Sequence, residues 1–497
     1  MDEMDNDWII DQWIGLFRTE KISGEIIGLC DNSSKRRILY VSYPDILLYS
    51  SGFAQCLLLR PEMTISCGER SLREYTGSPK DLRIWITGLP DECSSAFSEI
   101  KGKEDGGFCS VRGRIARILI SEPCRPADGS GAVNTVIMTG SGDGIQMMDV
   151  RLRGDNESAE IFGKTLIFNG FRNDGGIFEV NSIESQDNIF AISFSDEEKE
   201  EILKASKEPH FFDELIAQIA PDEDITDDTR SALALQLFRG VAKELDTGEM
   251  MYNNIHILLV ADHDIDPILE SVDRLSPIGL HLSDNGQYGP IHFSARITEH
   301  DDGNRSVEVG AVTIASGGLL SYGDLNRLED DDWYGLRYAA NGGTDVKSLP
   351  SGHSFSFPAD TELLCTIRSD GSEELPHGID KIFHMIIPVR GTDRKDRKGS
   401  VDHDDRCRKA KYSEEFIRRY IAYARLNCDP KMQESAGESL ISEYMSLRGM
   451  YEGVWTLHFF LLLYLAEASA RSRLSDTVDG IDIARSRTIL HNYLSRK

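Results

Sequence analysis

The chain has 497 residues, of which 40% are hydrophobic and 28% are charged, and its formal net charge is −29. This length exceeds what one compact core holds, so we expect three or four folded units. The negative charge opposes non-specific binding to DNA or to anionic membranes, and it favours solubility in strong salt. A surface adapted to a salty cytoplasm explains the charge as well as an acidic binding role does.

The cysteines and the first residues indicate which cellular compartment and which metal sites to expect. Nine cysteines are scattered without any C-x-x-C pair, so nothing resembles a zinc module or a disulfide framework. The chain opens Met1-Asp2-Glu3-Met4-Asp5 without a signal peptide, so we expect reduced thiols and a cytoplasmic location. The longest apolar run, 457–466, is too short to span a bilayer and predicts a buried helix. We expect no membrane partner and no metal.

The N-terminal part is predicted to be helical and then β-rich. Apolar positions recur at roughly helical spacing over 8–30, and the end of the stretch 40–62, "GFAQCLLLRPE", is compatible with a helix. From about residue 82 short β-rich runs follow, such as "GFCSVRGRIARILI" and "KTLIFNGF", divided by Gly, Asp and Asn. Several short strands separated by turn signals predict a small barrel or sandwich.

Two of these β-rich runs, "VRGRIAR" and "DVRLRGD", carry arginines in alternation. Alternation places side chains on one face of a strand, as a basic groove for single-stranded DNA would require. Exposed arginines that merely offset carboxylates are the alternative, and Phe108, Phe162, Phe168 and Phe171 could stack on bases or belong to the core. The candidate DNA-binding residues are Arg112, Arg114, Arg117, Arg151 and Arg153.

Beyond residue 190 the pattern is typical of an α/β domain followed by helices. A capped helix is predicted over 193–221 and a second helix follows it; strand, helix and loop signals then alternate to about residue 390. The charge-mixed segment 391–411 predicts an exposed connector, with nucleic-acid binding by its basic cluster as the alternative. Residues 413–497 are helical throughout.

One loop in the α/β region stands where NTPases hold phosphate. A buried strand is predicted over 255–260 and a helix from Pro267, but the loop between them contains no glycine and no lysine. It carries three carboxylates, Asp262, Asp264 and Asp266, while 201–350 as a whole holds 28 acidic and 11 basic side chains. Phosphate would meet like charge here, and Pro267 lacks the N–H that could bind an anion at the helix start.

Several segments resemble the minichromosome maintenance (MCM) family of replicative helicases, especially its archaeal members. "NNIHILLVAD" is similar to the strand before the family's P-loop, and "FIRRYIAYARLNCDPKM" and "YLAEASARSRLSDTVDGIDIARS" are similar to its helical lid. The resemblance covers most of 35–495 and implies a multidomain α/β and β fold. Its expected units are an N-terminal mainly helical subdomain (1–95), an OB-fold-like barrel lacking the zinc ribbon (96–190), a helical linker (191–225), an AAA+ P-loop NTPase-like α/β core (226–400) and a helical lid without a winged helix (401–497).

The resemblance also implies where ATP chemistry would reside, and those positions are changed. Asp264, Asp266 and Pro267 lie in the stretch of the P-loop, and no lysine or threonine exists between Val260 and Val272. The metal-binding and water-positioning acids of the Walker-B strand correspond to Gly323 and Asp324. The two arginines that act on a neighbour's nucleotide correspond to Gly378 and Leu457. We therefore expect no catalytic residue, no nucleotide binding and no cofactor.

Two functions remain open at this stage. The first is a catalytically degenerate MCM-like protein linked to DNA replication, which binds single-stranded DNA or an active MCM helicase and is a monomer or weak oligomer. The alternative is an active ATP-dependent helicase with a displaced phosphate loop in "AANGGTDVK", which would need ATP and Mg²⁺; its candidate residues are Gly342, Gly343, Thr344 and Lys347. Lone histidines such as His263, His353 and His403 are expected to be exposed turn residues rather than metal ligands.

Overall fold

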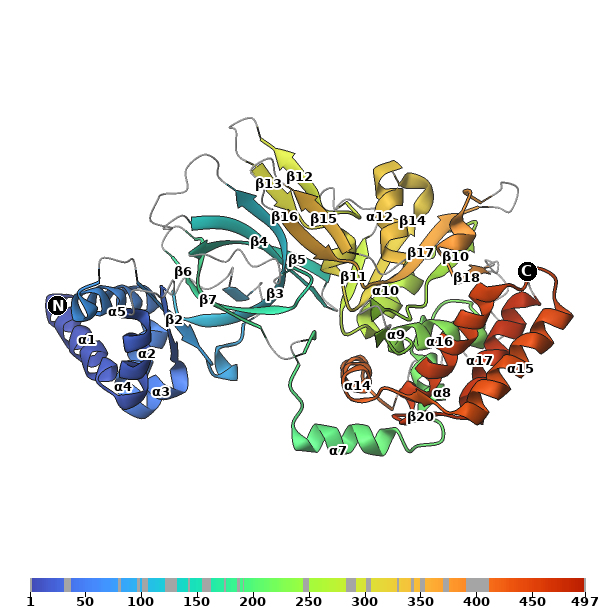
Figure 1. Cartoon of the computed structure of the whole chain (residues 1–497), viewed down its shortest axis with the longest axis horizontal. Coiled ribbons are helices and arrows are strands. Elements are labelled where there is room, and N and C mark those ends of the chain that lie inside the picture. Colours follow the sequence, from blue (N-terminus) through green and yellow to red (C-terminus); the bar gives the residue numbers. More distant parts are fainter. Residues whose placement is uncertain are drawn as a thin grey trace. The chain divides into compact units, whose positions relative to one another are not determined.

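The computed structural model divides into two compact units (Figure 1). The first comprises Met1–Thr139, Gln146–Ala191 and Ile297–Glu308, and the second Gly140–Ile145, Ile192–Arg296 and Val309–Lys497. No helix within the described ranges combines the length and the apolar character needed to cross a membrane. The structure describes residues 2–30, 37–78, 82–95, 99–100, 106–120, 132–141, 144–153, 162–173, 176–185, 188–190, 192–244, 250–282, 292–300, 305–328, 330–340, 344–348, 354–369, 375–389 and 411–495.

The first unit begins with helices around a buried aromatic centre, as the apolar spacing predicted. The Trp13 ring is fully buried, meets the Phe53 ring edge-on at 5.1 Å between centroids, and donates its indole N–H to the Thr64 carbonyl over 2.8 Å. Two parallel strands complete the subdomain. The elements are α1 (Asp2–Phe17), α2 (Glu20–Cys30), β1 (Ile38–Ser42), α3 (Tyr43–Tyr49), α4 (Ser51–Leu59), α5 (Pro61–Thr76) and β2 (Arg83–Thr87).

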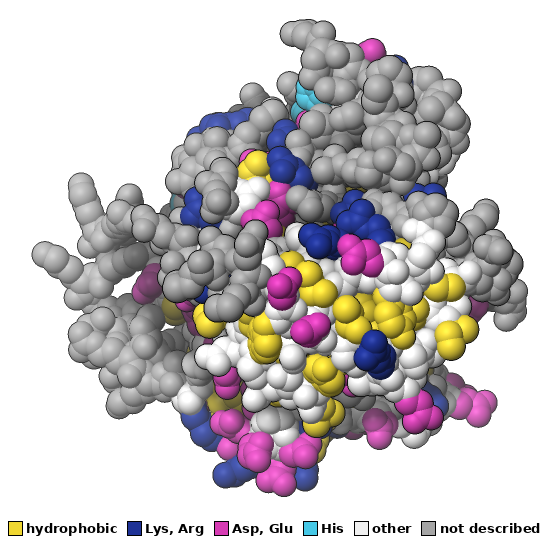
Figure 2. All heavy atoms as spheres, turned by 90° about the vertical axis from the view of Figure 1, so that its left-hand side faces the viewer, with side chains coloured by type: hydrophobic (Ala, Val, Ile, Leu, Met, Phe, Trp, Pro, Cys, Tyr) yellow, Lys and Arg dark blue, Asp and Glu magenta, His cyan; other side chains and the backbone are white. Residues whose placement is uncertain are grey.

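This helical subdomain also exposes large apolar side chains. Leu48 is 86% exposed, Ile27 72% and Leu59 67%. Figure 2 shows hydrophobic side chains in small groups on the visible face, separated by acidic and basic ones. Scattered apolar residues are normal on a protein surface, so the exposure of these three defines no binding site.

The predicted barrel is present. Its strands follow the order β12-β13-β3-β4-β5-β7-β6, and an additional β3–β6 pairing closes β3 to β7 into a ring. A β-bulge lies between Ile115 and Arg117 of β3, opposite β4. Residues 297–308, which the sequence places in the α/β core, extend this sheet through β13. The strands are β3 (Cys109–Ile120), β4 (Ala132–Ser141), β5 (Gly144–Arg153), β6 (Leu166–Arg172), β7 (Phe178–Ser185), β12 (Arg296–Glu299) and β13 (Arg305–Glu308).

The second unit contains a parallel sheet in the order β11-β14-β17-β10-β18. Its strands are short, apolar and buried, as in α/β proteins with helices on both faces. β10 pairs with β17 on one side and β18 on the other, so the loop after β10 lies at the carboxyl edge, where α/β sheets bind ligands. The strands are β10 (Ile257–Ala261), β11 (Gly279–Leu282), β14 (Leu319–Asp324), β17 (Glu362–Arg368) and β18 (Met385–Pro388).

Further helices and two short hairpins belong to the second unit. The helices include α7 (Asp196–Ala205), α8 (Phe211–Ala217), α9 (Asp227–Phe238), α10 (Asp266–Leu275), α11 (Ala311–Ile314) and α12 (Asp330–Ala340). Two antiparallel pairs join β8 (Lys243–Glu244) to β9 (Met250–Met251) and β15 (Thr344–Ser348) to β16 (Ser354–Pro358).

The C-terminal helices form the predicted lid, and buried polar contacts attach it to the end of α9 and the residues that follow. The Arg471 guanidinium donates to the carbonyls of Phe238, Arg239 and Gly240 over 2.8 to 3.1 Å. Glu467 accepts from the Val241 N–H over 2.9 Å. The lid elements are α14 (Glu414–Asn427), β19 (Lys431–Met432), α15 (Glu434–Met450), α16 (Thr456–Ser472), β20 (Thr477–Val478) and α17 (Gly480–Leu494).

Some sequence-based expectations lie outside the described residues. These are the place of the missing zinc ribbon around 121–131, most of the connector 391–411, His353, His403, Gly342 and Gly343.

Candidate functional site

The loop between β10 and α10 is held by its own carboxylates. The Asp264 carboxylate accepts from the Asp266 N–H over 3.0 Å, and Asp262 contacts the His263 ring nitrogen at 2.8 Å. α10 begins at Asp266, with Pro267 in its first turn and no side-chain cap. The predicted strand, loop and helix are confirmed, and in this loop carboxylate oxygens accept where a phosphate would need donors.

The Asp266 carboxylate lies against the end of β14. Its Oδ1 is 3.4 Å from the position that a Cβ at Gly323 would take, which is van der Waals contact distance. His281 of β11 is 3.9 Å away, measured from its Nε2 to Asp266 Oδ2, and its Nδ1 contacts the Ser321 hydroxyl at 2.9 Å. Burial lowers the pKa of His281 to about 4. The imidazole is therefore neutral at pH 7 and adds no positive charge to the site.

Asp324 has a structural use at the same edge. Its Oδ1 accepts from the Arg368 N–H over 3.0 Å and from the Asn326 N–H over 3.2 Å, and it caps the short helix η3 (Leu325–Arg327). The Asn326 amide in turn donates to the Arg368 carbonyl over 2.8 Å. This clasp joins the end of β14 to the end of β17. The sequence does not single out Asn326 or Arg368, because their pairing depends on strand order.

The charges at this edge disfavour phosphate. Among the described residues at this edge, Asp262, Asp264, Asp266 and Asp324 lie near the ends of β10 and β14, and Arg368 ends β17. Two unit charges about 4 Å apart near a surface interact by about 4 kcal/mol, so this carboxylate excess opposes an anion. Within the described ranges no group of three or more His, Cys, Asp or Glu side chains could hold a metal ion.

The two positions that correspond to the family's arginines, Gly378 and Leu457, carry no charge either. Gly378 has φ of +84°, a left-handed conformation that favours glycine, and it precedes the short helix η4 (Ile379–Lys381). Arg337 of α12 brings its Nη2 within 4.0 Å of the place of a Cβ at Gly378. Leu457 is half-buried in the first turn of α16.

Within the described part of the candidate displaced loop, Thr344–Ser348 form a β-strand. Thr344 and Lys347 lie inside β15, where they pair with Pro358 and Phe355 of β16. A P-loop lysine stands between a strand and the start of a helix, so that backbone N–H groups surround the phosphates. Lys347 lies within an antiparallel hairpin instead.

On the barrel, the arginines of β3 do not form the expected common face. Arg112 and Arg117 are exposed, but Arg114 is buried at 5% exposure and its Nε donates to the Thr165 hydroxyl over 3.1 Å. Burial lowers the pKa of Arg114 to about 9, so the guanidinium stays charged but does not reach solvent. The expectation for Arg114 was wrong. The bulge before Arg117 also interrupts the alternation on which it rested.

The arginines of β5 contribute no exposed charge that the structure describes. Arg151 forms an ion pair with Glu179 at 2.7 Å, while the side chain of Arg153 lies outside the described residues. The phenylalanines considered as stacking partners are core residues: Phe108, Phe162, Phe168 and Phe171 are at most 8% exposed. The basic groove predicted from the sequence therefore reduces to Arg112 and Arg117.

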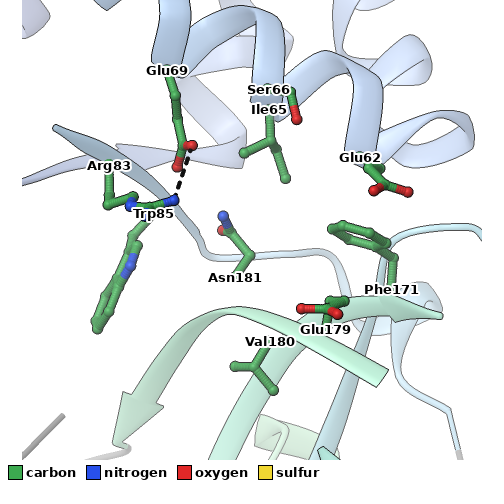
Figure 3. Close-up of a pocket in the computed structure, with 10 residues that line it drawn as sticks. All are labelled: Glu62, Ile65, Ser66, Glu69, Arg83, Trp85, Phe171, Glu179, Val180 and Asn181. Carbon is green, nitrogen blue, oxygen red and sulfur yellow. Dashed lines mark ion pairs between the residues drawn. The ribbon is translucent and has the colours of Figure 1, made fainter. Parts of the chain in front are cut away.

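A cleft between α5 and strands β2, β6 and β7 lies beside this ion pair (Figure 3). Glu179 and Phe171 line it, and Glu69 forms an ion pair with Arg83 at 3.5 Å. Glu179 also accepts from the Asn173 amide over 2.9 Å. Glu69 and Glu179 already have protein partners, so their contacts hold α5 and the strands together rather than bind a ligand.

Two protein-family models match this chain, one before and one within the C-terminal lid. Residues 198–342 match the model of the MCM P-loop domain, and residues 415–494 match that of the MCM AAA-lid domain. The DNA replication licensing factor mcm4 of Schizosaccharomyces pombe is 26% identical over 332 residues, which cover 60% of this chain and 36% of that one. The minichromosome maintenance protein MCM of Saccharolobus solfataricus is 24% identical over 347 residues, covering 64% and 50%.

The fold is similar over nearly the whole chain to a solved structure. A full-length MCM homolog from Methanopyrus kandleri superposes with a TM-score of 0.72 at 19% identity, covering 97% of this chain and 96% of that one. The chain spans 36% and 50% of the length of the two curated relatives described above.

Proposed function

The chain belongs to the MCM family, and from that premise we propose that it acts in DNA replication as an accessory or scaffold protein that does not hydrolyse ATP. Its direct ligands would be single-stranded DNA or an active MCM helicase. The observation that carries the proposal is the arrangement around Asp266. Its carboxylate lies beside Gly323, at the sheet edge where an NTPase would hold phosphate and Mg²⁺.

Loss at several positions together supports the absence of turnover. The loop has no lysine, Gly323 cannot bind Mg²⁺, and Gly378 has no side chain to stabilise transition-state charge. An arginine finger alone contributes about 10³ to 10⁵ in rate in well-studied NTPases. Removing that residue and the phosphate-binding lysine together leaves no route to useful hydrolysis.

The same reasoning bears on assembly. A closed ring needs matched front and back faces on each subunit. Nucleotide can strengthen such a contact when one subunit holds it and the next supplies a cation. With neither part retained, we propose a monomer or a weak oligomer when the chain is alone.

The decisive experiment is a calorimetric titration of the full chain with ATP and Mg²⁺, paired with a phosphate-release assay. We expect no binding up to about 1 mM, the upper end of common substrate affinities, and no release above the buffer rate. Micromolar affinity with Mg²⁺-dependent hydrolysis would refute the proposal. The matched variant Lys347→Ala then separates the alternatives, because loss of binding in this variant would identify the displaced loop as the ATP site.

Size-exclusion chromatography with light scattering tests the oligomeric state, and a ring without nucleotide would contradict the proposed monomer.

A further inference from the structure

Helix α12 has one buried face and one aromatic, cationic face. Leu336 and Ala339 are fully buried, which fixes the helix on the domain. On the opposite side Tyr334 is 67% exposed, Tyr338 is 46% exposed, and Arg337 between them is exposed as well. Positions i, i+3 and i+4 share one side of a helix, so the two rings and the guanidinium form one stripe.

The two tyrosines are not engaged inside the protein. Among the described residues, neither Tyr334 nor Tyr338 has a hydrogen bond or a ring partner. Two other exposed tyrosines differ: the Tyr40 ring meets Trp85 at 5.6 Å, and the Tyr75 ring meets Phe17 at 5.8 Å. The faces of the α12 rings therefore remain available for an external planar group.

Positive charge accompanies the rings. The Arg337 guanidinium lies beside Gly378, with its Nη2 4.0 Å from the position of a Cβ there. Lys381, three residues further along, is exposed. The stripe thus combines two stacking surfaces with the Arg337 cation, and Lys381 of η4 adds a second exposed cation beyond Gly378.

We propose that the exposed face of α12 is a stacking platform for single-stranded nucleic acid, with Tyr334 and Tyr338 each holding one unpaired base and Arg337 contacting the backbone. The rings are one helical turn apart, about 6 Å along the axis, a separation that suits bases splayed from an extended strand. A protein partner would need an apolar interface of about 800 Å² per side, whereas the exposed residues next to Gly378 are His377, Asp380 and Lys381. The inference shares its ligand class with the proposed function but assigns the contact to a helix outside the barrel.

Binding through rings rather than through many cations has its own salt dependence. Two phosphate contacts to a single strand give a slope of about −1.4 in log affinity against log salt. Affinity should then fall only about tenfold between 0.2 and 1 M NaCl, whereas six contacts would cost about a thousandfold. This tolerance suits a chain whose net charge of −29 opposes electrostatic capture of DNA.

The test measures fluorescence anisotropy of a labelled oligothymidylate with the full chain at about 0.2 and 1 M NaCl. The variants are Tyr334→Ala/Tyr338→Ala, Tyr334→Phe/Tyr338→Phe, and Leu48→Ala as a control at a side chain that is 86% exposed elsewhere. We expect the double alanine variant to raise Kd by at least about twentyfold, while the phenylalanine variant stays within about threefold because it keeps both rings. The Leu48→Ala variant should bind as the unaltered chain does.

Two results would refute the stacking platform on α12 but leave the proposed function unaffected. One is an alanine variant that binds the oligonucleotide as tightly as the unaltered chain, and the other is equal affinity for a duplex of the same length. A chain that binds no single strand at either salt concentration would refute both the platform and the DNA-binding part of the proposed function. The ATP titration is independent of each of these outcomes.

Discussion

His384 is the residue whose replacement tests the electrostatics of the sheet most directly. It precedes β18, and its Nδ1 accepts the His256 N–H over 3.0 Å, while its ring stacks on that of His256 with centroids 5.1 Å apart. His256 in turn accepts the Leu363 N–H over 3.1 Å. Tyr464 of the lid meets the His384 ring edge-on at 5.9 Å. Protonation at Nδ1 would break the hydrogen bond that His384 accepts.

The pKa values determine the sign of the effect. Burial, aided by the nearby His458, lowers the pKa of His384 to about 4, and burial next to His384 lowers the pKa of His256 well below its usual value. A histidine depressed in this way contributes stability that is fully present above its unfolded pKa of about 6.5, and that is lost as pH falls towards the folded value. With folded and unfolded values of about 4 and 6.5, the loss is about 2 kcal/mol at pH 5 and at most about 3.4 kcal/mol in total. Partial solvent access to the His384 ring makes these figures upper values.

The variant His384→Asn keeps an acceptor near the place of Nδ1 and removes the titration. Hydrogen–deuterium exchange of peptides from β10 and β18, expressed as protection factors between pH 7 and 5, measures the local opening free energy. We expect the unaltered chain to lose up to about 2 kcal/mol more than the variant over this range. His210→Asn, at a side chain that is 83% exposed, is the matched control and should follow the unaltered chain. If His384→Asn has the same pH slope as the unaltered chain, the reasoning fails.

Three further substitutions separate structural roles from catalytic ones. Arg239→Gly should destabilise the second unit by about 2 kcal/mol in thermal unfolding. Loss of the buried ion pairs to Asp360 and Glu362 costs about 3 to 5 kcal/mol, and relief of the backbone strain at φ +62° returns about 1 to 3 kcal/mol. An unchanged or raised Tm would count against this prediction. Gly378→Arg should cost about 1 to 2 kcal/mol because of the left-handed backbone and should restore no phosphate release; an active variant would contradict this. Asp324→Ala should lower stability by about 0.5 to 2 kcal/mol through loss of the η3 cap, an effect absent if Asp324 had only a catalytic use.

The strand, loop and helix around Asp264 could be predicted from the sequence because the signals there are local. A buried strand, a polar loop and Pro267 at a helix start define a place on the sheet without any knowledge of what lies opposite. The same reasoning failed for Arg114, because burial depends on Thr165, which lies 51 residues away. Alternation also assumes an unbroken strand, and the bulge before Arg117 violates that assumption.

The remaining features depend on pairings that no local pattern encodes. The clasp from Asp324 to Arg368 exists because β14 and β17 are neighbours. Periodicity on α12 separates two faces of the helix, but it does not tell which face the domain covers. The left-handed Arg239 gives no sequence signal, since its conformation is retained by carboxylates more than 120 residues away.

The contact between Asp266 and Gly323 has a consequence for any attempt to build a nucleotide site at this edge. An aspartate introduced at 323 would start with its Cβ 3.4 Å from an existing carboxylate oxygen and would be repelled. A cation introduced at 266 without that aspartate would have no Mg²⁺ partner to act with. Each single substitution is therefore unfavourable or without benefit, so under the proposed function a nucleotide site at this edge would require simultaneous substitutions on α10 and β14.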